Sequence, residues 1–199
     1  MVKAPSELHA CLTNERIDRI GNLIARTRQE NLAFADDRDN GWSLGCRAYT
    51  WCCNEIQQLA GNAEWLRIID PSLRFIFAIE NINISMYKGA PSKPKKNIQS
   101  RAQSYPELKQ ISLLSDIAIP SRLCWAYAVE TGSDGELTNI EFIGVSESGD
   151  VIASRRVPLN SIPQNVVGIH SQEDAPVDLP AAKVSLAATV KKLMVKGDD

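Results

Sequence analysis

The stretch that decides the fold spans residues 74–87 and reads RFIFAIENINISMY. Its apolar residues form two short runs around the polar pair Glu80 and Asn81. This pattern predicts two strands, 74–79 and 82–87, joined by a tight turn. In the second strand three apolar residues alternate with polar ones, which predicts one buried face and one solvent-facing side.

More strands are predicted on both sides of this pair. Residues 65–69 form a short strand, and the following Asp-Pro-Ser turn connects it to residue 74, which makes a three-stranded antiparallel meander. A second meander is predicted from three later strands, separated by glycine-containing turns, at residues 123–130, 137–145 and 151–157. In the first of these, Trp125, Tyr127 and Val129 share one face.

Helices are predicted before, between and after the two meanders. Residues 13–32 carry three isoleucines at helical spacing, with Thr13 as the expected N-cap. The acidic stretch 36–41 predicts an exposed turn. A second helix is predicted from an N-cap at Ser43 to Ala60, with an apolar stripe made of Ala48, Cys52, Ile56 and Leu59. Apolar spacing also predicts a short helix at 107–117 and a last helix at 180–195.

Separate runs of helices and strands indicate the α+β class rather than alternating α/β. The chain has 199 residues, of which 44 % are hydrophobic, enough for a sizeable core. We therefore expect a single domain over residues 1–199. Its antiparallel sheet would contain both meanders, with the N-terminal helices and the C-terminal helix packed on it.

Composition also limits the compartment and the partners. The longest apolar runs are far too short to span a bilayer, and no apolar segment follows the N-terminus as a secretory signal would require. The five cysteines are odd in number and lack the spacing of a disulfide framework, which is typical of reduced thiols. The expectation is a cytoplasmic protein without membrane contact.

Known catalytic motifs are missing from the sequence. It contains no glycine-rich phosphate loop, Cys-x-x-Cys, His-Glu-x-x-His or Gly-x-Ser-x-Gly, and its only histidines are His9 and His170. The cysteines of the second helix match no zinc module. Glu107 and Lys109 form the acid-x-Lys pattern of metal-dependent nucleases, but in a segment that looks helical rather than extended. We predict no catalytic residue, metal site or cofactor, and the sequence favours a non-enzymatic protein.

A basic, proline-rich loop at residues 88–106 is the main charged feature. Between Lys88 and Lys109 the formal charge is +5, within a chain whose net charge is -2. The basic residues are Lys88, Lys93, Lys95, Lys96, Arg101 and Lys109. Such a cluster can follow a phosphate backbone, and Tyr87 and Tyr105 at its ends could stack on bases. The alternative is a solvated loop that protects a sheet edge.

Two functions follow from these patterns. The favoured one is a non-enzymatic binding or accessory protein of bacterial or viral type that acts through protein contacts, including self-association. Trp42, Tyr49 and Trp51 support it, because one face of the second helix cannot bury all three aromatic rings. The alternative is a nucleic-acid-binding protein that uses the basic loop, with a metal-dependent nuclease as its catalytic extension.

Overall fold

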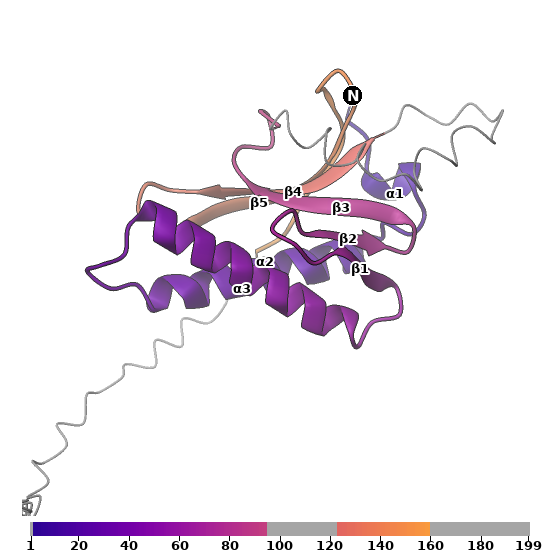
Figure 1. Ribbon diagram of the computed structural model, residues 1–199. Coiled ribbons are helices and arrows are strands. Elements are labelled where there is room, and N and C mark those ends of the chain that lie inside the picture. The colour runs from indigo at the N-terminus through magenta and orange to yellow at the C-terminus, as the bar shows by residue number, and fades with distance from the viewer. Residues whose placement is uncertain (1, 95–122, 160–199) are drawn as a thin grey trace, which may run out of the picture. The chain divides into compact units, whose positions relative to one another are not determined.

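The computed structural model describes residues 2–94 and 123–159, all of which belong to the unit Met1–Ile162. These residues form an α+β structure, in which helices lie against a six-stranded mixed sheet (Figure 1). The helices are α1 (Pro5–Leu8), α2 (Asn14–Ala33) and α3 (Gly41–Ala60). The strands are β1 (Leu66–Asp70), β2 (Ile76–Ile79), β3 (Ile82–Lys88), β4 (Cys124–Thr131), β5 (Leu137–Val145) and β6 (Val151–Arg156).

The strands follow one another in the sheet in the order of the sequence, β1 to β6. All neighbours pair antiparallel except β3 and β4, which pair parallel from Ile84 opposite Trp125 to Lys88 opposite Val129. The prediction of a purely antiparallel sheet was therefore wrong. Local patterns define hairpins, whereas the connection after Lys88 is long enough for a crossover, which parallel pairing requires.

Helix α2 forms where the isoleucine spacing predicts it. The Thr13 hydroxyl oxygen accepts a hydrogen bond from the backbone N–H of Arg16 at 3.3 Å and caps the helix. Ile17, Ile20 and Ile24 are fully buried. They face the sheet side of the core, so burial of one apolar stripe holds this helix in place.

Helix α3 begins earlier than predicted. Its N-cap is Asn40, whose side-chain oxygen accepts from the N–H groups of Trp42 and Ser43 at 2.9 and 3.0 Å. Ser43, the predicted cap, is instead the third residue of the helix, and its hydroxyl accepts a hydrogen bond from the Asn40 N–H at 2.9 Å. Asn is as good a cap as Ser, and the reciprocal capping box uses both residues. Ala48, Cys52 and Ile56 are buried as expected, but Leu59 is only partly buried.

The two long helices lie side by side on one face of the sheet, with α2 against β5 and α3 against β1 (Figure 1). Trp125, Tyr127 and Val129 point into this helix-facing core. A smaller buried cluster occupies the opposite face of the sheet and contains Tyr87, Cys124, Ala126, Ala128, Ile143 and Val145. Strand β3 is consequently buried on both faces, not on one as predicted, because it lies inside the sheet between β2 and β4.

The chain's first residues add to the far edge of the sheet. Lys3 forms a parallel bridge with Ala153 of β6, and its N–H donates to the Ile152 carbonyl at 2.9 Å. Within the described ranges, no helix is both long enough and apolar enough to cross a bilayer. The helices predicted at 107–117 and 180–195 lie outside the described residues.

Candidate functional sites

The predicted basic loop is described only at its start. Lys88 and Lys93 are exposed, whereas Lys95, Lys96, Arg101 and Lys109 lie outside the described residues, as do Tyr105 and the acid-x-Lys triplet at 107–109. Tyr87 does not offer its ring for base stacking. It is 6 % exposed, and its hydroxyl donates to the Ala90 carbonyl at 3.2 Å. Burial raises the pKa of this phenol to about 12.

Four of the five thiols lack the lowered pKa of a catalytic nucleophile. Burial raises the pKa of Cys52 and of Cys53 to about 12, and it raises the pKa of Cys11 and Cys124 as well. These thiols stay protonated at neutral pH, whereas a nucleophilic cysteine needs a lowered pKa. All five cysteines are free, and Cys46 is exposed.

His9, one of the two histidines that a nucleophilic site could use, lies against an aromatic ring. Its imidazole meets the edge of Trp125 with ring centroids 5.7 Å apart, and burial lowers its pKa. His170 lies outside the described residues. In the part of the chain that the structure describes, no three His, Cys, Asp or Glu side chains gather as metal ligands would.

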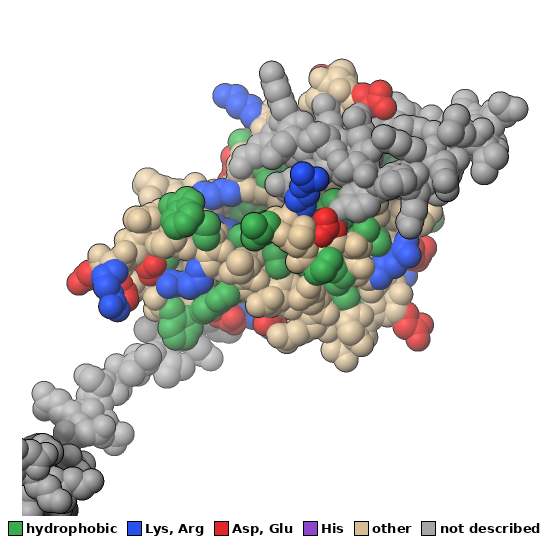
Figure 2. Space-filling model, in the orientation of Figure 1, with side chains coloured by type: hydrophobic (Ala, Val, Ile, Leu, Met, Phe, Trp, Pro, Cys, Tyr) green, Lys and Arg blue, Asp and Glu red, His purple; other side chains and the backbone are tan. Residues whose placement is uncertain are grey.

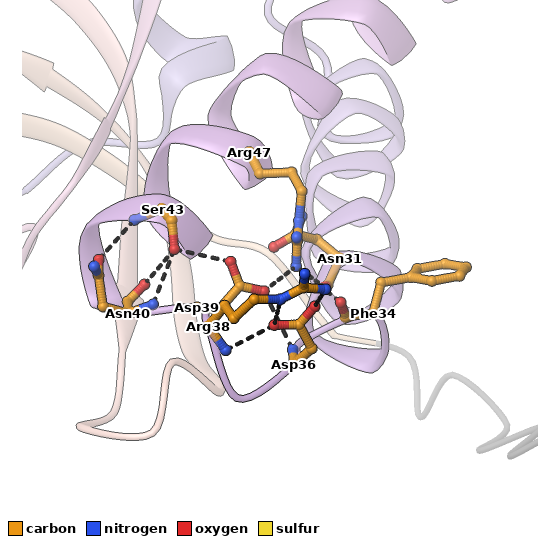
Figure 3. Close-up of polar contacts among 8 residues, drawn as sticks. All are labelled: Asn31, Phe34, Asp36, Arg38, Asp39, Asn40, Ser43 and Arg47. Carbon is orange, nitrogen blue, oxygen red and sulfur yellow. Dashed lines mark hydrogen bonds and ion pairs between the residues drawn. The ribbon is translucent and has the colours of Figure 1, made fainter.

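The turn between α2 and α3 is held by a polar network (Figure 3). Asp39 pairs with Arg47 at 3.0 Å and accepts a hydrogen bond from the Ser43 hydroxyl at 2.8 Å. Arg47 also donates to the Phe34 carbonyl at 3.1 Å, so it joins the end of α2 to α3. The bond from Ser43 is the main cause that lowers the pKa of Asp39. The turn is therefore a fixed corner, although its sequence predicts only an exposed loop.

A second ion pair lies at the tip of this corner. The Asp36 carboxylate accepts from the backbone N–H of Arg38 at 2.7 Å and from its guanidinium at 2.9 Å. The side-chain hydrogen bond from Arg38 is the largest cause that lowers the pKa of Asp36. Because Arg38 is largely exposed, this pair shapes the turn but adds little stability.

An apolar stripe begins directly after the corner. We call Trp42, Cys46 and Tyr49, together with the neighbouring Leu73, the α3 stripe. The three helical residues are spaced by four and three, so they lie on one face of α3. Trp42 is 78 % exposed and Leu73 is 83 % exposed, and the Tyr49 hydroxyl donates to the Leu73 carbonyl at 3.1 Å. Figure 2 shows hydrophobic side chains along the face that carries α3.

Gly45 interrupts this face of the helix. A Cβ atom placed on it would meet nothing within 4 Å, so the protein's own packing does not require glycine there. Phe34 and Trp51 lie away from the stripe and contact each other edge to face, with centroids 5.8 Å apart. The sequence indicated an excess of aromatic residues here, but only the structure separates the rings that pack together from the one that is exposed.

A cavity of about 540 Å³ opens beside the first turns of α2. Its walls include Glu15, Arg16 and Arg19 of α2, Trp65 before β1, and Glu80 in the β2–β3 turn. The Arg16 guanidinium pairs with the Glu80 carboxylate at 2.6 Å. The guanidinium carbons of Arg16 and Arg19 lie 5.4 and 6.0 Å from the Trp65 ring centroid.

Glu80 has a left-handed backbone, with φ of 53°. This conformation is uncommon outside glycine and asparagine and carries strain. Two hydrogen bonds to its backbone hold it: the Glu80 N–H donates to the Trp65 carbonyl at 2.8 Å, and the Arg67 side-chain Nε–H donates to the Glu80 carbonyl at 3.1 Å. Sequence reasoning predicted a turn at Glu80 but missed the cavity. No local signal links Glu80 to Arg16, 64 positions earlier.

Comparisons with family models, curated proteins and solved structures gave no match for this chain.

Proposed function

We propose that this chain is a non-enzymatic binding protein that acts through protein–protein contacts, and that the α3 stripe is its contact surface. The observation that carries the proposal is the 78 % exposure of Trp42 on a well-formed helix. An indole exposed to water forgoes the stabilisation that burial of a large aromatic ring provides. Exposed tryptophan and tyrosine are the residues that most often dominate binding at interfaces.

The corner before α3 supports the proposal because it fixes the backbone that carries the tryptophan. Asn40 caps the helix through the Trp42 N–H itself, and Asp39 ties the same turn to Arg47. A contact surface that is rigid before binding loses less conformational entropy when a partner arrives. The polar network thus presents Trp42 on a preformed surface.

We expect the binding partner to be a second copy of this chain. The two α3 helices would pack against each other antiparallel, related by a twofold axis. The stripe contains no Asp, Glu, Lys or Arg, so it meets itself without like-charge repulsion. Gly45 lies near the middle of the stripe, where a glycine lets two helix backbones approach closely.

The size of the stripe sets the expected strength of this contact. Trp42 exposes on the order of 200 Å². A contact limited to two such stripes buries less than the roughly 1,200 Å² at which stable interfaces begin. We therefore expect a weak dimer whose population depends on protein concentration.

Sedimentation equilibrium across the micromolar range tests the proposal. Wild-type protein should show a concentration-dependent monomer–dimer equilibrium, and Trp42→Ala should shift it to monomer because the most exposed aromatic side chain of the stripe is lost. Phe34→Ala is the matched control, since Phe34 is 64 % exposed but lies off the stripe. Wild-type protein that stays monomeric at every concentration would contradict the proposed occupant.

Oxidative cross-linking gives a second, independent measurement. Cys46 is exposed and next to the midpoint of the stripe, so a twofold antiparallel pair brings Cys46 close to its copy. Mild oxidation should give a disulfide-linked dimer that Cys46→Ser abolishes. Cross-linking that persists in Trp42→Ala would show that random collisions, not the stripe, produce the dimer.

Nucleic-acid binding by residues 88–109 stays the alternative function. Lys88 and Lys93 are exposed, and no carboxylate of the described residues pairs with either. This alternative requires binding to DNA or RNA that weakens steeply as salt rises. Replacing Lys93, Lys95 and Lys96 by Glu would then abolish binding, and wild-type protein without salt-sensitive binding at low ionic strength would exclude it.

A further inference from the structure

The cavity beside α2 is a separate feature from the α3 stripe and has a different chemistry. It holds two guanidinium groups, Arg16 and Arg19, and two carboxylates, Glu15 and Glu80. The charges do not all neutralise one another. Arg16 and Glu80 form a close pair at 2.6 Å, and Arg16 also donates to the Cys11 carbonyl at 3.1 Å.

Glu15 and Arg19, the other two charged residues of the cavity, form no ion pair among the described residues. They are four residues apart on α2, with the acid nearer the N-terminus, which is the favourable order for a helical ion pair. Arg19 instead lies against the Trp65 ring, 6.0 Å from its centroid. One cation and one anion therefore line the same cavity without a partner of opposite charge.

We propose that this cavity binds a free α-amino acid. The Arg19 guanidinium is suited to bind the carboxylate of the ligand by donating two parallel N–H hydrogen bonds to it. The Glu15 carboxylate is suited to accept hydrogen bonds from the ammonium group of the ligand. An α-amino acid carries both charged groups on one α-carbon and offers an opposite charge to each of the two side chains, whereas a simple anion would be repelled by Glu15.

The remaining walls fit this ligand in size and rigidity. The volume of about 540 Å³ lies within the usual range for small-molecule sites. Two hydrogen bonds fix the strained turn that forms one wall: Arg16 donates to the Glu80 carboxylate, and Arg67 donates to the Glu80 carbonyl. Trp65 lies beneath both guanidinium groups, so its indole N–H reports on occupancy.

The test is a titration of the full chain, followed by ¹H–¹⁵N NMR at the Trp65 indole N–H and the Arg19 Nε–H. The probes are L-leucine, L-phenylalanine and L-glutamate, each compared with its N-acetyl and its amide derivative. At least one free amino acid should give saturable shifts at both groups with a dissociation constant of about 1 mM or below. Both derivatives should bind at least tenfold more weakly, because each lacks one charge.

Two variants test whether Arg19 binds the ligand's carboxylate and Glu15 its ammonium group. Arg19→Gln and Glu15→Gln should each weaken binding tenfold or more, and both side chains are exposed. Arg26→Gln is the matched control, since Arg26 lies on the same helix but does not line the cavity. If Arg19→Gln proves unfolded by circular dichroism, Glu15→Gln and the derivatives still decide the question.

Three results would overturn the proposal: no saturable shift with any of the three amino acids, equal binding of an N-acetyl derivative, or an equal loss in Arg26→Gln. None of these bears on dimerisation, because the cavity and the α3 stripe share no residue.

Discussion

The hydroxyl of Tyr127 donates a hydrogen bond to the carbonyl of Ile17 at 3.0 Å, across 110 positions of the chain. Tyr127 is fully buried on β4, and Ile17 is fully buried in α2. The bond thus fixes the first turns of α2 over the centre of the sheet. Burial also raises the pKa of Tyr127 well above its usual value, so the donor proton is retained.

Tyr127→Phe should lower the free energy of unfolding by about 1 kcal/mol, the usual net contribution of one hydrogen bond. The aromatic packing against Phe142, at 4.9 Å between centroids, is retained in this variant. Urea denaturation followed by far-UV circular dichroism measures the change. An unchanged midpoint would show that the hydroxyl bond contributes nothing.

Two helical glycines should respond in opposite ways to alanine. At Gly21 a Cβ would lie 2.5 Å from the Val157 Cγ2 atom, so Gly21→Ala should destabilise the fold although alanine favours helix. At Gly45 the Cβ meets nothing within 4 Å, so Gly45→Ala should stabilise the monomer by about 0.5–1 kcal/mol. Thermal unfolding of the two variants at one low concentration compares them.

The same substitution at Gly45 bears on the proposed dimer. The added methyl group lies where two helices would approach closely, so Gly45→Ala should weaken association while it stabilises the monomer. Sedimentation equilibrium separates the two effects. A variant that gains stability and dimerises as well as wild type would move the contact away from Gly45.

The buried face of α3 should be sensitive at Ile56. Ile56→Ala should cost about 2–5 kcal/mol, because the side chain is fully buried and leaves a cavity. Leu59→Ala should cost less, since Leu59 is only partly buried. The exposed control Gln57→Ala should stay within about 0.5 kcal/mol. Equal urea midpoints for Ile56→Ala and Gln57→Ala would contradict this assignment of the face.

Stability should fall at alkaline pH through the buried thiols. Burial raises the pKa of Cys52 from 9.0 to about 12, so the folded state holds a proton that the unfolded state has lost. This contribution is fully present below pH 9 and is lost as pH rises towards 12. The slope for one thiol is at most about 1.4 kcal/mol per pH unit.

Urea midpoints measured from pH 8 to pH 11 for matched cysteine variants test this dependence. Cys52→Ala should show a shallower decline than wild type, whereas Cys46→Ala should follow wild type because Cys46 is exposed. Thiol labelling of the native protein at neutral pH should modify Cys46 quickly and leave Cys52 protected. Fast labelling of Cys52 would contradict its burial.

Local patterns were sufficient for most individual elements. The isoleucine spacing and the Thr13 cap specify α2, and the hairpin turns specify the strands, because helix period, capping and turn chemistry depend on residues only a few positions apart. The same locality explains the error at the start of α3. Asn40 and Ser43 are both good caps three residues apart, and the sequence does not show which one occupies the N-cap.

What the sequence by itself determined is therefore the α+β class, the hairpins and the apolar faces of the two long helices. The tertiary structure decided the parallel pairing of β3 with β4, the burial of Tyr87, the exposure of Trp42 and the meeting of Arg16 with Glu80. Each of these depends on contacts between segments far apart in the chain. Their free energy comes from packing and electrostatics that exist only once the chain has folded, so no local pattern encodes them.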